Sequence, residues 1–196
     1  MRRSATRSWQ ELRHAAAIIA LCVACAAVGV MPALALDRIS DDDGPGVVDA
    51  DVRQLASFRL TVPVVGVAKR NLTDTYSQRR GIRPHEALDI PAPRGTQVIA
   101  AGDGRVVKLF RSLAGGLTVY QFDPSERFSY YYAHLDHYAQ GLTEGTMLKR
   151  GDAIGAVGST GNARDDSPHL HFAIFKLGPE KKWWQGSPIN PFPLLN

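Results

Sequence analysis

The chain has 196 residues, which suits one globular domain with some additional sequence and is too short for two large domains. Its formal net charge of +4 comes mostly from residues 1–35, which carry four arginines and one glutamate. The rest of the chain holds 19 basic and 18 acidic residues, so it lacks the electrostatic footprint of a nucleic-acid-binding protein.

Residues 1–35 have the pattern of a secretory signal peptide. A basic region is followed by an apolar, alanine-rich run over residues 15–30 and by an A-x-A cleavage pattern at Ala33-Leu34-Ala35. An uncleaved membrane anchor is the alternative, because the apolar run is about long enough to span a bilayer. Both cysteines, Cys22 and Cys25, lie in this segment, so we expect a periplasmic or secreted mature chain without a disulfide.

Residues 36–58 are expected to form a flexible linker. They contain the run Asp41-Asp42-Asp43 followed by Gly-Pro-Gly, which lacks the spaced ligands and the closing glutamate of a calcium loop. After residue 35, no stretch of ten residues has a convincing helical periodicity. The sequence therefore predicts an acidic spacer before a folded domain at 59–196.

From residue 59 onward the sequence is typical of a β protein. Short apolar runs alternate with glycines and prolines that recur about every eight to twelve residues, as in a β-sandwich or a partly open barrel. Gly102-Asp103-Gly104 and Asp123-Pro124-Ser125 each favour a hairpin. The predicted fold class is mostly β, with strands over residues 60–67, 97–101, 105–109, 117–122, 128–134, 152–158 and 172–177.

Histidines occur at positions that a strand would place on one face. His169 and His171 are two residues apart, so their rings would leave the same face about 7 Å apart, with apolar neighbours packed behind. A metal ion or a catalytic water between them is one interpretation, and a pair of surface histidines on an edge strand is the other. The same alternation predicts that Tyr130, Tyr132 and His134 share a face, where either tyrosine could reach a groove or pack in the core.

The stretch HEALDIP at residues 85–91 resembles the H-E-x-x-H helix of zinc proteases, with Asp89 in place of the second histidine. A continuing helix is excluded, however, by the flanking prolines Pro84, Pro91 and Pro93. A turn that leads into a short strand still lets His85 and Asp89 converge on one ion, because their spacing is even. Glu86 would then be a solvated carboxylate and not a general base.

Four motifs in this order are similar to those of the lysostaphin-like (LytM-type) zinc peptidases, which cut peptidoglycan peptides. The resemblance covers about residues 63–195. The motifs are Arg83-x-His85-x-x-x-Asp89, Tyr132-Ala133-His134-Leu135, Gly151-Asp152-x-Ile154-Gly155 and Pro168-His169-Leu170-His171-Phe172.

The resemblance implies an antiparallel β-sandwich or open barrel of the duplicated hybrid motif type, with a substrate groove over the central sheet. It implies that His85, Asp89 and His171 bind Zn²⁺ and leave a fourth position open for chemistry. His134 and His169 match the family's two further histidines. The resemblance assigns these two to catalysis, as groups that orient a water, transfer its proton and stabilise an oxyanion.

The sequence departs from the family pattern at three places. Ala87 replaces a usual glycine, Asp166-Ser167 replaces Thr-Gly, and Ala173 stands where glutamate is frequent. The last two departures affect the residues expected to support the metal ligands and the expected shape of the groove. They do not affect the identity of the ligands themselves. Separately, the run Lys181-Lys182-Trp183-Trp184 could bind a glycan, while packing of both indoles against the sheet is the favoured interpretation.

The leading hypothesis is an exported zinc endopeptidase that hydrolyses peptide bonds in peptidoglycan stem peptides or cross-links. The alternative is a non-catalytic wall-binding module of the same fold that activates another wall hydrolase. All five histidine and aspartate positions are filled, and residues 36–58 are too short for the coiled coil common in such modules, which favours the enzyme. A regulatory or recruiting protein is a further expected partner, with membrane contact only through an uncleaved N-terminal segment.

Overall fold

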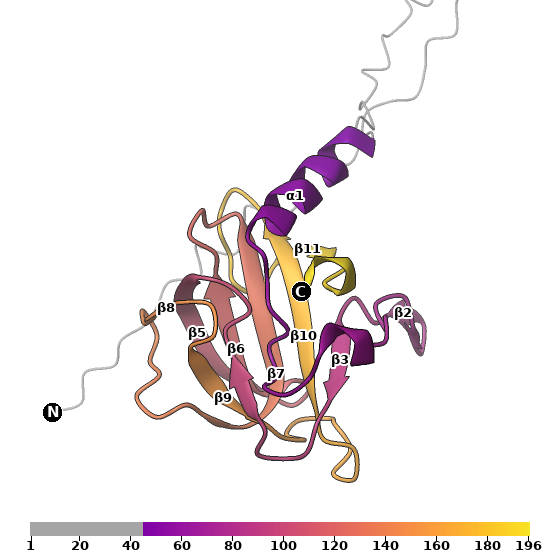
Figure 1. The fold of residues 1–196 in the computed structure, drawn as a ribbon, viewed down its shortest axis with the longest axis vertical. Coiled ribbons are helices and arrows are strands. Elements are labelled where there is room, and N and C mark those ends of the chain that lie inside the picture. The colour runs from indigo at the N-terminus through magenta and orange to yellow at the C-terminus, as the bar shows by residue number, and fades with distance from the viewer. Residues whose placement is uncertain (1–44) are drawn as a thin grey trace, which may run out of the picture. The chain divides into compact units, whose positions relative to one another are not determined.

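The structure is a computed structural model and describes residues 45–196 of the chain (Figure 1). The predicted signal peptide at 1–35, with both cysteines, and the first residues of the predicted linker lie outside the described residues. Within the described range, no helix is both long enough and apolar enough to cross a bilayer. The account that follows concerns this range alone.

A helix, α1 (Pro45–Ser57), is present where the sequence predicts a flexible linker. Leu55 of this helix is fully buried, and Asp51 is only 4% exposed. The Asp51 carboxylate forms ion pairs with Arg127 at 2.8 Å and with Lys176 at 2.6 Å. Short helices in proteins are stabilised mainly by packing of one face, so these contacts, which periodicity alone does not reveal, explain the difference.

The core of the domain is a nine-stranded sheet whose hydrogen-bonded strand pairs are all antiparallel. Its main path runs β11-β10-β7-β6-β5-β8, with β3 paired to β10 and with β9 joining β4 to β7 (Figure 1). A separate hairpin is formed by β1 and β2. The prediction of a mostly β, antiparallel fold is confirmed.

The strands of the domain have the following bounds: β1 (Arg79–Arg80), β2 (Arg83–Pro84), β3 (Leu88–Pro91), β4 (Gln97–Ile99), β5 (Gly104–Ser112), β6 (Gly116–Phe122), β7 (Phe128–Tyr138), β8 (Met147–Leu148), β9 (Ala153–Val157), β10 (His169–Leu177) and β11 (Gly186–Ile189). Two short 3₁₀ helices are also present, η1 (Lys69–Asn71) and η2 (Phe192–Leu194).

Side chains of β10 alternate between a buried core and an open groove. Leu170, Phe172 and Ile174 are fully buried, whereas His169 and His171 line the groove on the other face. This alternation is the one predicted from the sequence, and it follows from the two-residue period of a strand. The two imidazoles are therefore held on a strand whose opposite face is fixed in the hydrophobic core.

Tyr130 and Tyr132 of β7 are both fully buried in the core, so packing is the correct interpretation for this pair. The Tyr132 hydroxyl donates to the side-chain oxygen of Gln121 at 2.8 Å and accepts from the backbone N–H of Ala101 at 3.0 Å. Burial raises the pKa of both tyrosines above their usual range. They stay neutral and serve the structure of the sheet, not the groove.

His134 leaves the alternation that Tyr130 and Tyr132 follow, so the prediction that all three share a face is wrong. Its backbone has a φ of 61°, a left-handed conformation that is rare for residues other than glycine. The register between β7 and β6 also shifts at this point, so β7 contains a β-bulge. Because of this bulge, the His134 side chain does not follow Tyr130 and Tyr132 into the core but lines the groove.

Candidate metal centre and its groove

The stretch at residues 85–91 is a turn followed by strand β3, and not a helix. Glu86 has a φ of 57°, and its backbone N–H donates to the carbonyl of Tyr76 at 2.9 Å. A left-handed residue at this position is incompatible with a continuing α-helix. The Glu86 side chain is exposed, and Glu86 is not one of the residues that line the groove. The hypothesis of a zinc-protease helix is thereby excluded.

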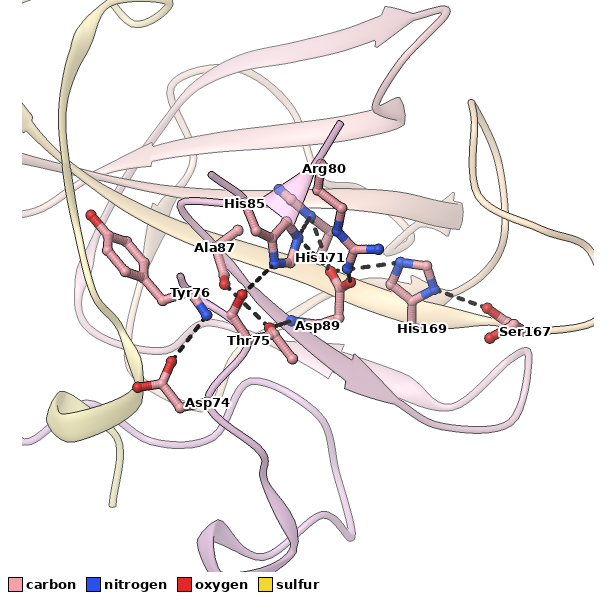
Figure 2. Close-up of polar contacts among 10 residues, drawn as sticks. All are labelled: Asp74, Thr75, Tyr76, Arg80, His85, Ala87, Asp89, Ser167, His169 and His171. Atoms are coloured by element: carbon pink, nitrogen blue, oxygen red, sulfur yellow. Dashed lines mark hydrogen bonds and ion pairs between the residues drawn. The ribbon is translucent and has the colours of Figure 1, made fainter. Parts of the chain in front are cut away.

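Antiparallel pairing of β3 with β10 brings the predicted ligands together. Asp89 lies directly opposite His171 in the register of the two strands. His85, four residues before Asp89, reaches the same point from the preceding turn (Figure 2). Strand pairing therefore brings His171 to the neighbouring pair His85 and Asp89, which lie more than 80 residues earlier in the chain.

The three converging donor atoms form a nearly equilateral triangle. His85 Nε2, His171 Nδ1 and Asp89 Oδ1 are each 3.1 Å from the other two. Ligands about 2.0–2.1 Å from a tetrahedral zinc ion lie about 3.3 Å from one another, so the triangle matches the spacing that this ion needs. Two imidazoles and one carboxylate are also a frequent donor set of catalytic zinc, which leaves one position open.

Neighbouring groups fix the orientation of two of these donors. His85 Nδ1 lies 3.0 Å from the backbone carbonyl oxygen of Thr75, and because a carbonyl only accepts, Nδ1 carries the proton. The lone pair of the neutral ring is then on Nε2, which faces the other donors. The Thr75 hydroxyl in turn accepts the backbone N–H of Asp89 at 3.0 Å (Figure 2). Thr75 thus supports His85 and Asp89 at once.

The carboxyl group of Asp89 is held in its charged form. Burial acts to raise its pKa, but the adjacent imidazoles of His171 and His85 outweigh burial and hold the pKa well below the usual range. The second carboxylate oxygen, Oδ2, accepts from the Arg80 guanidinium at 2.5 Å. This arrangement leaves Oδ1 directed at the two imidazole nitrogens, as a cation between the three groups requires.

His134 and His169 lie beside the triangle on the groove side. Their ring centroids are 5.0 Å apart, and His134 is 5.6 Å from His171 by the same measure. His134 Nδ1 donates to the carbonyl of Thr160 at 2.8 Å, and His169 Nδ1 donates to that of Ser167 at 2.9 Å. In the neutral rings, Nε2 is therefore the unprotonated nitrogen of both residues.

His134 is held in its neutral form at neutral pH. Burial is the main cause and lowers the pKa of its imidazole to about 4, and the nearby rings of His171 and His169 act in the same direction. The hydrogen bond to Thr160 opposes this shift without cancelling it. A neutral ring with a free Nε2 can accept a proton, which is the requirement for a general base.

The groove is a cavity of about 680 Å³ that contains all five predicted site residues. Thr75, Arg80 and Tyr131 are among the other residues that line it, and the sequence analysis assigned none of these three to the site. Tyr131 lines the groove between its buried neighbours, and its ring centroid is 6.0 Å from that of His171. Alternation of side chains along β7 predicts that Tyr131 lies on the face opposite to Tyr130 and Tyr132. No pattern in the sequence indicates that Thr75 or Arg80 contacts a metal ligand.

The departures from the family pattern leave these contacts in place. His169 is supported by the backbone carbonyl of Ser167, which does not depend on the side chain at that position. Asp166 forms an ion pair with Arg164 at 2.7 Å at the groove edge. Ala173 is 1% exposed and lies opposite Tyr131 in the strand register, so its small side chain leaves room for that ring.

Comparisons with known proteins identify the family and the fold. The model of the family described as Peptidase family M23 matches residues 83–191, more than half of the chain. A mutant of the catalytic domain of the prophage-encoded M23 protein EnpA from Enterococcus faecalis has the same fold. That solved structure has a TM-score of 0.53 and 27% identity, and the match covers 69% of this chain and 95% of that chain.

Two curated relatives carry names that describe an activity. The L-Ala--D-Glu endopeptidase of Bacillus subtilis (strain 168) is 31% identical over 129 residues, which are 62% of this chain and 38% of the relative. The peptidoglycan DD-endopeptidase ShyC of Vibrio cholerae is 31% identical over 149 residues, which are 73% of this chain and 33% of the relative. The matched region therefore spans less than two fifths of either relative.

Proposed function

Because the chain belongs to peptidase family M23, we propose that it is a zinc-dependent endopeptidase that hydrolyses peptide bonds in peptidoglycan. The observation that carries the proposal is the convergence of His85, Asp89 and His171 within 3.1 Å of one another, beside two imidazoles with free nitrogens. The names of the two curated relatives, both endopeptidases, support the class of reaction. Export follows from the signal-peptide pattern at residues 1–35 and is part of the same proposal.

Zinc fits the donor set, and His85 Nε2, Asp89 Oδ1 and His171 Nδ1 would hold it. When bound, the ion supplies Lewis-acid chemistry, because it polarises a carbonyl oxygen and makes water a stronger acid. The Thr75 hydroxyl holds the backbone N–H of Asp89, and the Arg80 guanidinium holds its carboxylate. The chain thereby orients the ligands before any substrate arrives.

His134 is suited to move the proton that peptide hydrolysis must transfer. Its neutral Nε2 can accept a proton from the attacking water, and the imidazolium formed can return that proton to the nitrogen of the leaving amine. Water then supplies the hydroxyl of the new carboxyl group and the hydrogen of the new amine. Thr160 holds the ring in the tautomer that this transfer needs.

His169 is placed to stabilise charge on the reacting carbonyl oxygen. Its Nε2 lies 3.7 Å from Asp89 Oδ1, which sets it at the edge of the donor triangle and facing the groove. The neutral ring presents a lone pair at Nε2, so His169 donates a hydrogen bond to a developing oxyanion in its protonated form, and such donors contribute strongly to catalysis. The two histidines therefore divide proton transfer and oxyanion stabilisation between them.

Digestion of purified peptidoglycan sacculi, followed by mass analysis of the released peptides, tests the proposal. The purified protein should bind about one zinc ion per chain and release peptides whose masses identify the bond that is cut. A chelator should stop the release, and added zinc should restore it. Zinc binding without release of any peptide would instead support the non-catalytic wall-binding module.

A further inference from the structure

The segment that joins β10 to β11 holds Trp183 and Trp184 in a fixed loop. Two backbone turns close it, one from the Lys181 N–H to the Gly178 carbonyl and one from the Gln185 N–H to the Lys182 carbonyl, both at 3.1 Å. The strands on either side remain paired up to the loop itself, because Leu177 lies opposite Gly186. The backbone of the loop is therefore anchored at both ends.

The two tryptophans differ in their surroundings. Trp183 packs on the sheet, with ring centroids 4.8 Å from Tyr120 and 5.4 Å from Phe110. Trp184 contacts Trp183 edge to face, with ring centroids 5.2 Å apart, and is 62% exposed, and Phe110 is 40% exposed beside them. The packing interpretation of the sequence thus holds for Trp183, whereas Trp184 presents an indole to solvent. Contiguous exposed aromatic surface of this kind marks a binding site more often than a lone exposed side chain does.

This aromatic surface is continuous with the groove. Tyr120 lies opposite Tyr131 in the register of β6 and β7, and their ring centroids are 4.6 Å apart. Tyr131 lines the groove and lies 6.0 Å from His171. An unbroken row of rings therefore leads from the donor triangle to Trp184, which lies within about 21 Å of the His171 ring.

We propose that Trp184, supported by Trp183 and Phe110, binds the glycan strand of peptidoglycan by stacking on an N-acetylated hexosamine ring. This inference rests on the proposed function, since it names the second part of the same substrate. A pyranose ring has an apolar C–H face that stacks on an indole and a polar rim that hydrogen-bonds to its surroundings. The exposed side chains of Lys181 and Gln185 supply donors for that rim next to the indole.

The size of the surface favours a sugar over a protein partner. The exposed part of one indole and one phenyl ring is on the order of 150–200 Å². A stable protein interface buries about 800 Å² on each partner, which is several times more. One or two sugar rings match the available area, and the flat, rigid indole loses little conformational entropy when it binds them.

The distance from the donor triangle also fits this substrate. An extended peptide of about five residues spans at most about 18 Å. Stem peptides of about this length link the cleavable bonds of peptidoglycan to its sugars. A stem bound in the groove would therefore leave its sugar within reach of Trp184, so one substrate molecule could contact both sites.

Binding to peptide-free glycan tests the proposal without relying on hydrolysis. Titration of the full chain with peptide-free glycan strands, monitored by calorimetry, should give saturable binding that is weakened at least about 10-fold in Trp184→Ala. Trp184→Phe should retain most of the binding, because an aromatic face remains. Met147→Ala is the matched control, since Met147 is 69% exposed on the edge strand β8, and it should bind as the unmodified chain does.

Hydrolysis then separates the two sites. Trp184→Ala should require about 10-fold more sacculi for half-maximal peptide release, while its cleavage of a soluble, glycan-free stem peptide should be unchanged. Unaltered glycan binding in Trp184→Ala, or no binding by the unmodified chain, would overturn the glycan site even if peptides are cleaved. Glycan binding that depends on Trp184 in a chain that cleaves nothing would support the glycan site and overturn the proposed peptidase function.

Discussion

Asp89 and His171 face each other across the antiparallel pair of β3 and β10, with Oδ1 and Nδ1 3.1 Å apart. This contact joins the two halves of the donor triangle, which come from positions 82 residues apart in the chain. The register of two strands, and not the conformation of a loop, sets its distance. Such a site is rigid before metal or substrate binds, which suits a hydrolase that depends on preorganised groups.

Loss of a donor from the triangle should abolish metal binding. Asp89→Ala or His171→Ala is expected to weaken zinc affinity by more than about 100-fold, because two donors rarely hold this ion. Zinc content after dialysis measures the effect. Glu86→Ala is the control, since Glu86 is exposed and does not line the groove, and it should retain both zinc and activity. Loss of activity in Glu86→Ala would revive the general-base hypothesis for that residue.

Removal of the His134 ring should separate chemistry from metal binding. His134→Ala is expected to keep one zinc per chain and to lose about 10²–10³ in turnover, because the proton acceptor is gone while the ligands remain. Zinc content and the rate of peptide release are the two readouts. His137→Ala serves as the comparison, since this neighbouring histidine has a side chain that is 64% exposed and lies outside the groove. Full turnover in His134→Ala would contradict the assigned role.

The Thr75 hydroxyl should matter for the metal even though it is not a ligand. Thr75→Val removes the acceptor of the Asp89 N–H but keeps the carbonyl that holds His85. Zinc affinity is expected to fall about 10-fold, the lower end of the range for groups that orient ligands. Competition with a chromophoric chelator measures this change. Thr75→Ser retains the hydroxyl and should restore the affinity, whereas equal losses in both variants would point to a packing effect.

Docking of α1 should contribute to stability without affecting chemistry. Asp51→Ala removes the buried carboxylate that holds Arg127 and Lys176, and we expect about 1–3 kcal/mol of destabilisation. Thermal unfolding of the purified chain measures the loss. Zinc content and turnover at 25 °C should stay unchanged, because these contacts lie outside the groove lining. A parallel fall in zinc binding would show that the helix and the site are coupled.

Local sequence rules and the family resemblance together pointed to the five candidate site residues, but the local rules misplaced one of them. The prolines around residues 85–91 exclude a helix, and the spacing of His169 and His171 places both rings on one face. The same alternation applied to β7 gave the wrong face for His134, since a bulge and a φ of 61° interrupt it. A bulge depends on the partner strand, so the sequence of one strand does not contain the information needed to predict it.

Helix α1 illustrates a second limit. Its apolar positions are too few for periodicity to stand out, and its stability comes from contacts with Arg127 and Lys176, which lie more than 70 residues further along the chain. The exposure of Trp184 and the packing of Trp183 likewise follow from the position of one loop over Tyr120 and Phe110. Neighbours in space, and not neighbours in sequence, decide both outcomes.

The sequence by itself determined three things: the chemical types of the donor side chains, the two-residue strand period that places His169 and His171 on one face, and the prolines that prevent a helix around His85. These are local properties, because side-chain identity and backbone sterics act within a few residues. The tertiary structure alone decided that β3 pairs with β10 in the register that joins Asp89 to His171 and that Thr75 supports both His85 and Asp89. Long-range strand pairing is selected by burial of the whole sheet, and no single segment specifies it.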